Sequence, residues 1–235
     1  RSGRPAYEIE KSSYSLADAK PVQGKDGKAE QVLTVPMVFK TADGVEVIKT
    51  FSFKQGEYPI TVSHKIVNRS GQNWQGQMFG QLKRDNSEDP GKSDQGIFTL
   101  GTFLGGAWGS PDEHYNKLKF ANFNDEKLSV EAKGGWVAMV QHYFVSAWVP
   151  GELKLTQAEG QPFAAKLESR KSNDDMNIIG FTSPTINVPA GTAAEVDATF
   201  YSGPKIQSEL KDLAVGLNQT VDYGWLWPIA KLLFL

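Results

Sequence analysis

The stretch from Val32 to Val67 decides the fold class, and it reads VLTVPMVFKTADGVEVIKTFSFKQGEYPITVSHKIV. Short apolar runs in this stretch are separated by turn-forming tripeptides, Ala-Asp-Gly at 42–44 and Gln-Gly-Glu at 55–57. Within 60–66, isoleucine, valine and histidine alternate with threonine, serine and lysine. A period of two is typical of a β-strand with one face on a core. The stretch therefore predicts successive strands of a sheet.

Two later stretches carry further strand signals. Residues 194–200 alternate again, with alanine, valine and phenylalanine set against glutamate, aspartate and threonine. From Trp136 to Val149 both faces are apolar, which suits a central strand covered on each side. Turn signals such as Val-Pro-Ala-Gly at 188–191 lie between short strands, and this spacing favours sheets packed face to face. We therefore predict an all-β fold.

The composition excludes several classes of protein. The 235 residues include 13 Phe, 7 Tyr and 6 Trp, enough for a sizeable core, so the chain is not disordered, and we expect no second core. Its 25 basic and 27 acidic residues are nearly balanced, which makes nucleic acid an unfavourable partner. The absence of cysteine excludes disulfides, thiol catalysis and thiolate metal sites. The chain starts at Arg1 and stops inside an apolar run, so we expect it to be part of a longer protein.

The pattern changes after Gly203-Pro204, where apolar residues recur at helical spacing. We predict an amphipathic helix from about Pro204 to Val215, with Pro204 in its first turn and Gly216 as its stop. Its apolar stripe is expected to dock the helix onto the β-structure. The stripe consists of Ile206, Leu210, Leu213 and Leu217.

The terminal segment 223–235 reads YGWLWPIAKLLFL and needs an apolar partner. A transmembrane helix requires about 20 apolar residues, and a lysine at the bilayer centre costs roughly 3 kcal/mol, so this segment with Lys231 does not span a membrane alone. Tyrosine and tryptophan favour the membrane interface, and a lysine there reaches the headgroups. We therefore expect Tyr223, Trp225 and Trp227 to lie near a membrane surface. Two alternatives remain open: the segment completes the core, or it begins a spanning helix.

The three histidines make no catalytic motif. His64 lies on the apolar face of its strand and is expected in the core, and His114 is expected on a surface loop. His142 shares a predicted strand face with Trp136 and Phe144, which favours core or cleft packing. The sequence contains no HxxxH, HExxH, GxSxG or phosphate-loop pattern. We therefore predict no catalytic, cofactor-binding or metal-binding residues and no enzymatic activity.

Several tryptophans have two possible roles, because they either pack in the core or line a concave face for an extended chain or a sugar. Core packing is favoured for Trp136 and Trp148. Trp108 lies among the glycines of 101–109, where a bent backbone leaves a large ring partly exposed. We therefore predict that Trp108 contacts a partner. Tyr115 belongs to the same predicted partner surface, since aromatic and charged residues alternate there.

Four segments carry a family resemblance, and they appear in the same order as in the family. They are FGQLK at 79–83, SPDEHY at 110–115, GGWVAMVQHYF at 134–144 and TVDYGWLW at 220–227. Together they resemble YidC, the family of bacterial membrane-protein insertases. The resemblance implies a β-supersandwich similar to galactose mutarotase, closed by C-terminal α-helices. It also implies a position on the periplasmic side of the bacterial inner membrane.

By this resemblance, residues 1–203 form the supersandwich, and 204–235 form a C-terminal helix and a membrane-proximal segment. The expected role is an accessory one in membrane-protein insertion, since the family's insertion groove lies beyond Leu235. The implied partners are the Sec translocase with its accessory subunits, nascent membrane-protein segments and the membrane interface. Two alternatives stay open: a periplasmic carbohydrate-binding or mutarotase-like protein, and a passive spacer. The candidate contact residues are Trp108, Tyr115, Ile206, Leu210, Leu213, Leu217, Tyr223, Trp225 and Trp227.

Overall fold

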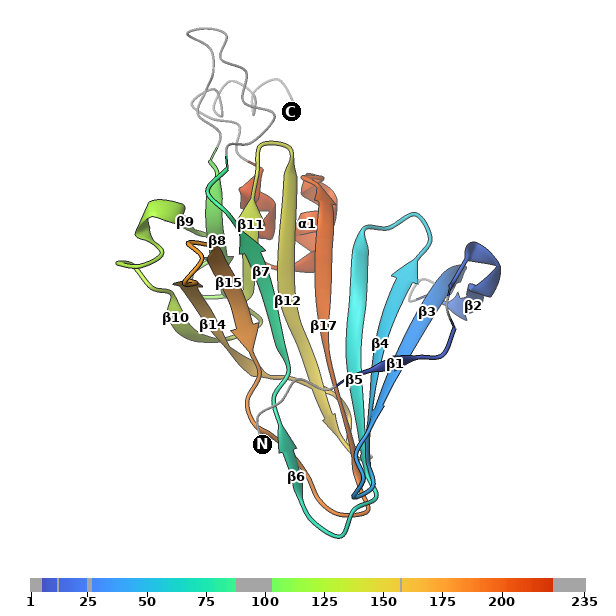
Figure 1. Ribbon diagram of the computed structural model, residues 1–235. Coiled ribbons are helices and arrows are strands. Elements are labelled where there is room, and N and C mark those ends of the chain that lie inside the picture. The colour runs from blue at the N-terminus through green and yellow to red at the C-terminus, as the bar shows by residue number, and fades with distance from the viewer. Residues whose placement is uncertain (1–5, 12, 25–26, 88–102, 157, 222–235) are drawn as a thin grey trace, which may run out of the picture. The chain divides into compact units, whose positions relative to one another are not determined.

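The computed structural model describes residues 6–11, 13–24, 27–87, 103–156 and 158–221 (Figure 1). Strands account for 56% of the structure and helices for 8%. The chain divides into two compact units. The first comprises Arg1–Met78, Pro150–Phe163 and Ser183–Tyr201, and the second comprises Phe79–Val149, Ala164–Thr182 and Ser202–Leu235. The boundary that we expected after residue 203 stays a prediction.

The first unit is built on antiparallel strands in the order β1-β3-β4-β5-β17, with β2 beside β3, β13 beside β12, and β16 paired with β6. Strands β12 and β17 also contribute residues to the second unit. The elements are β1 (Glu8–Ile9), η1 (Leu16–Asp18), β2 (Lys20–Gln23), β3 (Ala29–Lys40), β4 (Val45–Lys54), β5 (Pro59–Asn68), β6 (Trp74–Gly76), β12 (Phe144–Leu155), β13 (Gln161–Pro162), β16 (Ile186–Val188) and β17 (Ala193–Pro204).

The alternation predicted for this sheet is confirmed. In the register, Val47 lies opposite Ile66, and Ile66 lies opposite Ala194, so these three side chains share one face. All three are buried. Lys65 and Glu195 point to the other face and are exposed. One apolar and one polar face make this the half-buried sheet that a period of two predicts.

The second unit contains two sheets. One has the order β12-β11-β8-β9, and the other has the order β10-β14-β15-β7. Large side chains without exposed surface form its core, among them Trp136, Phe123, Leu167 and Ile179. The elements are β7 (Phe79–Arg84), β8 (Gly105–Gly109), β9 (Asn116–Lys119), η2 (Phe120–Asn122), β10 (Ser129–Lys133), β11 (Trp136–Val140), β14 (Ala164–Lys171), β15 (Asn177–Thr182), α1 (Gln207–Leu213) and η3 (Leu217–Thr220).

The prediction of one continuous strand from Trp136 to Val149 is wrong. The segment folds back as a hairpin, in which β11 and β12 are joined through residues 141–143 and Gln141 N donates to Phe144 O at 3.0 Å. All five residues of β11 are buried between β8 and β12, so the central position is confirmed for this strand. His142 lies in the turn and not on a strand face, because the chain reverses there.

The last five residues of the glycine-rich stretch form β8, Gly105–Gly109, and its glycines permit the close approach of other groups. A Cβ atom on Gly106 would lie 2.8 Å from the ring of Phe123, too close for any side chain. Phe123 itself has no exposed surface. A glycine at 106 therefore lets an aromatic ring pack directly on the strand backbone.

The C-terminal helix is present but shorter than predicted. Helix α1 spans Gln207–Leu213, while Pro204 still belongs to β17 and the backbone of Ala214 is extended. Leu217 begins the separate turn η3, so the predicted stripe is divided between two short helices. Among the described residues no helix has the length and apolar character needed to cross a bilayer.

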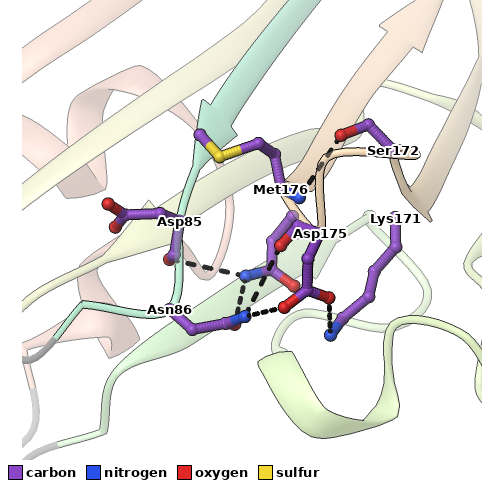
Figure 2. Close-up of polar contacts among 7 residues, drawn as sticks. Asp85, Asn86, Lys171, Ser172, Asp175 and Met176 are labelled. Atoms are coloured by element: carbon purple, nitrogen blue, oxygen red, sulfur yellow. Dashed lines mark hydrogen bonds and ion pairs between the residues drawn. The ribbon is translucent and has the colours of Figure 1, made fainter.

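A polar network ties the end of β7 to the turn between β14 and β15 (Figure 2). Asn86 Nδ2 donates to Asp175 Oδ2 at 2.8 Å, and Asn177 Nδ2 donates to Asn86 Oδ1 at 2.8 Å. Asp175 adopts φ 58° and also accepts from Lys171 Nζ at 2.8 Å. The hydrogen bond from Lys171 is the main cause that lowers the pKa of Asp175. The turn at Asp174-Asp175 is thereby fixed to a neighbouring strand.

Candidate functional site

The candidate site is the place in the second unit where the C-terminal backbone meets β11. Trp136, the first residue of β11, has no exposed surface, and its Nε1 donates to Val215 O at 2.8 Å. Val215 lies in the turn between α1 and η3, and its side chain is 52% exposed. Because a buried indole N–H needs an acceptor, this bond fixes the turn to the sheet.

The segment before β9 closes the same site. The ring of Tyr115 stacks on Trp136 with centroids 6.2 Å apart and an angle of 23° between the planes. Gly216 adopts φ 82°, and a Cβ atom at this position would lie 1.9 Å from the carbonyl oxygen of His114. Only glycine satisfies both the left-handed backbone and this approach. Residues 114–115 and 215–216 thus pack together around Trp136.

The predicted apolar stripe is buried to different degrees. Leu210 of α1 and Leu217 of η3 have no exposed surface, whereas Ile206 and Leu213 are partly exposed. Ile206 precedes the helix with extended backbone. A helix of this length does not bury a leucine completely by itself, so other parts of the chain cover Leu210. The burial agrees with a docked helix, and the effect of docking on insertion stays a prediction.

Trp108 lies apart from this site. It is partly exposed on β8, opposite Val137 of β11 and Asn116 of β9. Since Trp136 lies opposite Gly109, Trp108 and Trp136 project from opposite faces of the sheet. The structure therefore does not join Trp108 and Tyr115 into one surface around Trp136. The partner role predicted for each remains untested, and Tyr223, Trp225 and Trp227 lie outside the described residues.

Comparison with known proteins places the chain in a family. The family model of the YidC periplasmic domain matches residues 6–235. The chain belongs to the YidC periplasmic domain family. It is 44% identical over 233 residues to proteins named membrane protein insertase YidC from Pseudomonas putida and Pseudomonas entomophila, and 42% identical to that of Stutzerimonas stutzeri. These alignments cover 99% of this chain and 38% of each relative.

Solved structures extend the comparison to the fold of this YidC periplasmic domain. The α-galactosidase from Lactobacillus brevis is similar over 93% of this chain and 29% of its own, with a TM-score of 0.50 and 10% identity. A galactose mutarotase related enzyme from Lactobacillus acidophilus matches 80% of this chain and 78% of its own, with a TM-score of 0.45 and 10% identity. The predicted all-β, galactose-mutarotase-like supersandwich is confirmed, and the C-terminal helices predicted with it are few. At 10% identity the likeness concerns the fold alone, so it identifies no carbohydrate-binding residues in this chain.

The histidines of this YidC periplasmic domain occupy three different settings. His114 is exposed, as predicted. His142 was expected in a core or cleft, but it lies in the hairpin turn, where its ring centroid is 4.0 Å from that of Tyr143. His64 faces the apolar side of β5, and its buried Nδ1 has no hydrogen-bond partner among the described residues. Burial, and then the charge of Lys49, lower the pKa of His64 to about 4.

The described residues contain no group of three or more histidine, cysteine or acidic side chains positioned to hold a metal ion. Two features escaped sequence reasoning. One is the acceptor role of the Val215 carbonyl, which no sequence pattern signals because it is a backbone atom. The other is Lys49. Here the sequence does carry a signal that could have located it, because Lys49 interrupts the apolar alternation of Val45, Val47 and Phe51.

Proposed function

We propose that this chain is a non-catalytic accessory domain of a membrane-protein insertase on the periplasmic side of the bacterial inner membrane. It assists the insertion and folding of membrane proteins by contacting partners and by coupling its C-terminal segment to the membrane-embedded part of the insertase. Membership of the YidC periplasmic domain family is the observation that carries this proposal. The chain spans 38% of the length of its curated relatives, and we assign the insertion step itself to their remaining part.

The coupling is argued from the docked C-terminus. The hydrogen bond from Trp136 to Val215 and the buried Leu210 and Leu217 hold the backbone that leads to residue 221. The segment 223–235 follows directly, and its Tyr223, Trp225 and Trp227 suit the headgroup region of a bilayer. A fixed exit direction would let the folded domain orient the chain at the membrane surface. The proposed partners are the Sec translocase, its accessory subunits and nascent membrane-protein segments.

The test uses the full-length insertase that contains this domain, in cells depleted of their own copy. Leu210→Asp places a charge at a buried position and is expected to detach α1, because burying an unpaired carboxylate is strongly unfavourable. Lys211→Asp, at the neighbouring exposed position, is the matched control. We expect insertion of a reporter membrane protein to fall with Leu210→Asp and to persist with Lys211→Asp.

Deletion of residues 6–203 with retention of 204–235 separates the accessory role from a passive spacer. A spacer predicts normal growth and insertion after this deletion, whereas the accessory role predicts a defect. A Leu210→Asp variant that melts at the wild-type temperature and still supports insertion would contradict the coupling. Turnover of a sugar by the purified chain would contradict the non-catalytic assignment.

A further inference from the structure

Two polar side chains face each other on the otherwise apolar side of the sheet in the first unit. Lys49 on β4 lies directly opposite His64 on β5, in adjacent strands (Figure 1). Their neighbours along the same face are Val47 and Phe51 on β4 and Val62 on β5. Both side chains are partly exposed, whereas Val47 and Val62 are buried. A lysine and a histidine thus interrupt a face whose other side chains are apolar, as is typical of a core.

Neither side chain has a polar partner within the part of the chain that the structure describes. Lys49 forms no hydrogen bond or ion pair there, and its Nζ lies 4.7 Å from the centroid of the Phe51 ring. His64 Nδ1 is buried and receives no hydrogen bond. A buried polar atom is normally paired, so the unpaired Nδ1 of His64 beside the Lys49 ammonium makes this border of the apolar face a candidate binding site.

Among the residues that the structure describes, the groups that face the pair carry no negative charge. Across the strands, Lys49 faces Met37 of β3, and His64 faces Val196 of β17. The ring of Tyr7 lies 6.5 Å from that of His64, and burial raises the pKa of this tyrosine, which keeps it neutral. Burial lowers the pKa of Lys49, and burial together with Lys49 lowers that of His64. The positive charge of Lys49 is therefore uncompensated on this face.

The surroundings determine which anion fits. Phe53 is 37% exposed on the same face, and Val35, Met37 and Phe51 are partly exposed. A small hydrated anion would lose its water against these groups without a compensating apolar contact. A carboxylate attached to apolar neighbours buries them at the same time, because transfer of apolar surface from water is favourable. The Lys49 ammonium supplies a charge-assisted hydrogen bond, and the neutral imidazole supplies one N–H donor.

We propose that Lys49 and His64 bind the carboxylate of an aspartate or glutamate within an extended, otherwise apolar polypeptide segment. This inference rests on the proposed function, in which such segments of nascent membrane proteins are clients. It adds which feature of the segment is recognised, namely one acidic side chain flanked by apolar residues.

Peptide binding to the purified 235-residue chain tests the site. The probes are two fluorescent peptides of alternating valine and threonine, identical except for a central glutamate or glutamine, followed by fluorescence anisotropy. We expect the glutamate peptide to bind about tenfold more tightly, as one charge-assisted hydrogen bond provides. Lys49→Met should abolish this preference, and Lys49→Arg should retain it. Lys65→Met is the matched control, since Lys65 is adjacent to His64 but exposed on the opposite face.

The titration of His64 by NMR provides a second readout. The glutamate peptide should raise the pKa of His64, because a nearby carboxylate stabilises the imidazolium, and the glutamine peptide should not. The pKa of His64 is also measured with acetate or inorganic phosphate alone, where an increase would indicate a site for free anions. The same measurement with vesicles that contain phosphatidylglycerol would show a site for lipid headgroups.

Equal affinity for the two peptides, or a preference that survives Lys49→Met, would overturn the proposal. So would a shift of His64 by acetate, phosphate or vesicles as large as that by the glutamate peptide. These measurements are independent of insertion in cells. Failure of peptide discrimination with a normal response to Leu210→Asp would therefore reject this site and leave the accessory role standing.

Discussion

Trp136 donates its indole N–H to the backbone carbonyl of Val215 at 2.8 Å, which joins the start of β11 to the turn between α1 and η3. The two residues are far apart in the sequence, and the indole is completely buried. A long-range bond of this kind makes the position of the C-terminal turn depend on the integrity of the sheet. The proposed coupling to the membrane therefore depends on the stability of this contact.

Replacement of Trp136 by phenylalanine removes the donor and keeps an aromatic ring. We expect the free energy of unfolding to fall by about 1–3 kcal/mol, because the Val215 carbonyl loses its partner and the smaller ring leaves space. Urea denaturation measures the loss, and hydrogen exchange should show faster opening of α1 and η3. Trp108→Phe is the control, since Trp108 is partly exposed on the opposite face. Equal losses for the two variants would count against a special role of the bond.

Gly216→Ala is expected to destabilise the chain through two effects. The alanine must adopt φ 82°, and its Cβ atom would lie 1.9 Å from the carbonyl oxygen of His114. Gly56→Ala separates these effects, because Gly56 has φ 81° with nothing within 4 Å of its Cβ position. Adopting the left-handed backbone conformation costs an alanine about 1–2 kcal/mol of stability, even without a steric clash. The melting temperature should therefore fall further for Gly216→Ala than for Gly56→Ala, and equal decreases would contradict the close packing at residue 114.

Local pattern accounted for part of the fold. The period of two in 32–67 and 194–200 predicted β3, β4, β5 and β17, because one side of each strand is buried. Periodicity does not predict the hairpin within 136–149, because both faces of β11 are apolar. The reversal at 141–143 also contains neither glycine nor proline, the usual signals of a turn.

The candidate site was only partly predictable for a related reason. The helical spacing located Leu210 and Leu217 as buried residues, but the break between α1 and η3 depends on packing against His114, a long-range contact that spacing does not encode. The alternation of aromatic and charged residues predicts one partner surface that contains both Trp108 and Tyr115. Strand alternation and register place Trp108 on the face opposite Trp136, on which Tyr115 stacks.

Asn177 and Asp175 should differ strongly in their contributions to stability. Asn177 has no exposed surface, and its Nδ2 is bonded to Asn86, so Asn177→Ala removes this hydrogen bond and leaves a cavity at a cost of about 2 kcal/mol. In the ion pair between Asp175 and Lys171, the Asp175 side chain is 70% exposed, so solvent screens the interaction. Asp175→Asn should therefore change the urea midpoint far less than Asn177→Ala does. A larger effect of Asp175→Asn would show that the turn, and not the buried amide, carries the network.

The stability of the chain should fall as the pH is lowered from about 6.5 to about 4, through His64. Burial and Lys49 lower its pKa in the folded state to about 4 from the usual 6.5, so the unfolded state binds the proton more readily in this window. The contribution amounts to roughly 3 kcal/mol when fully expressed. His64→Gln should flatten the dependence of the unfolding free energy on pH in this range, and Lys49→Met should weaken it, because one cause of the lowered pKa is removed. His114→Gln, at an exposed histidine, is the matched substitution for comparison. A wild-type slope in the His64→Gln variant would show that other groups govern acid unfolding.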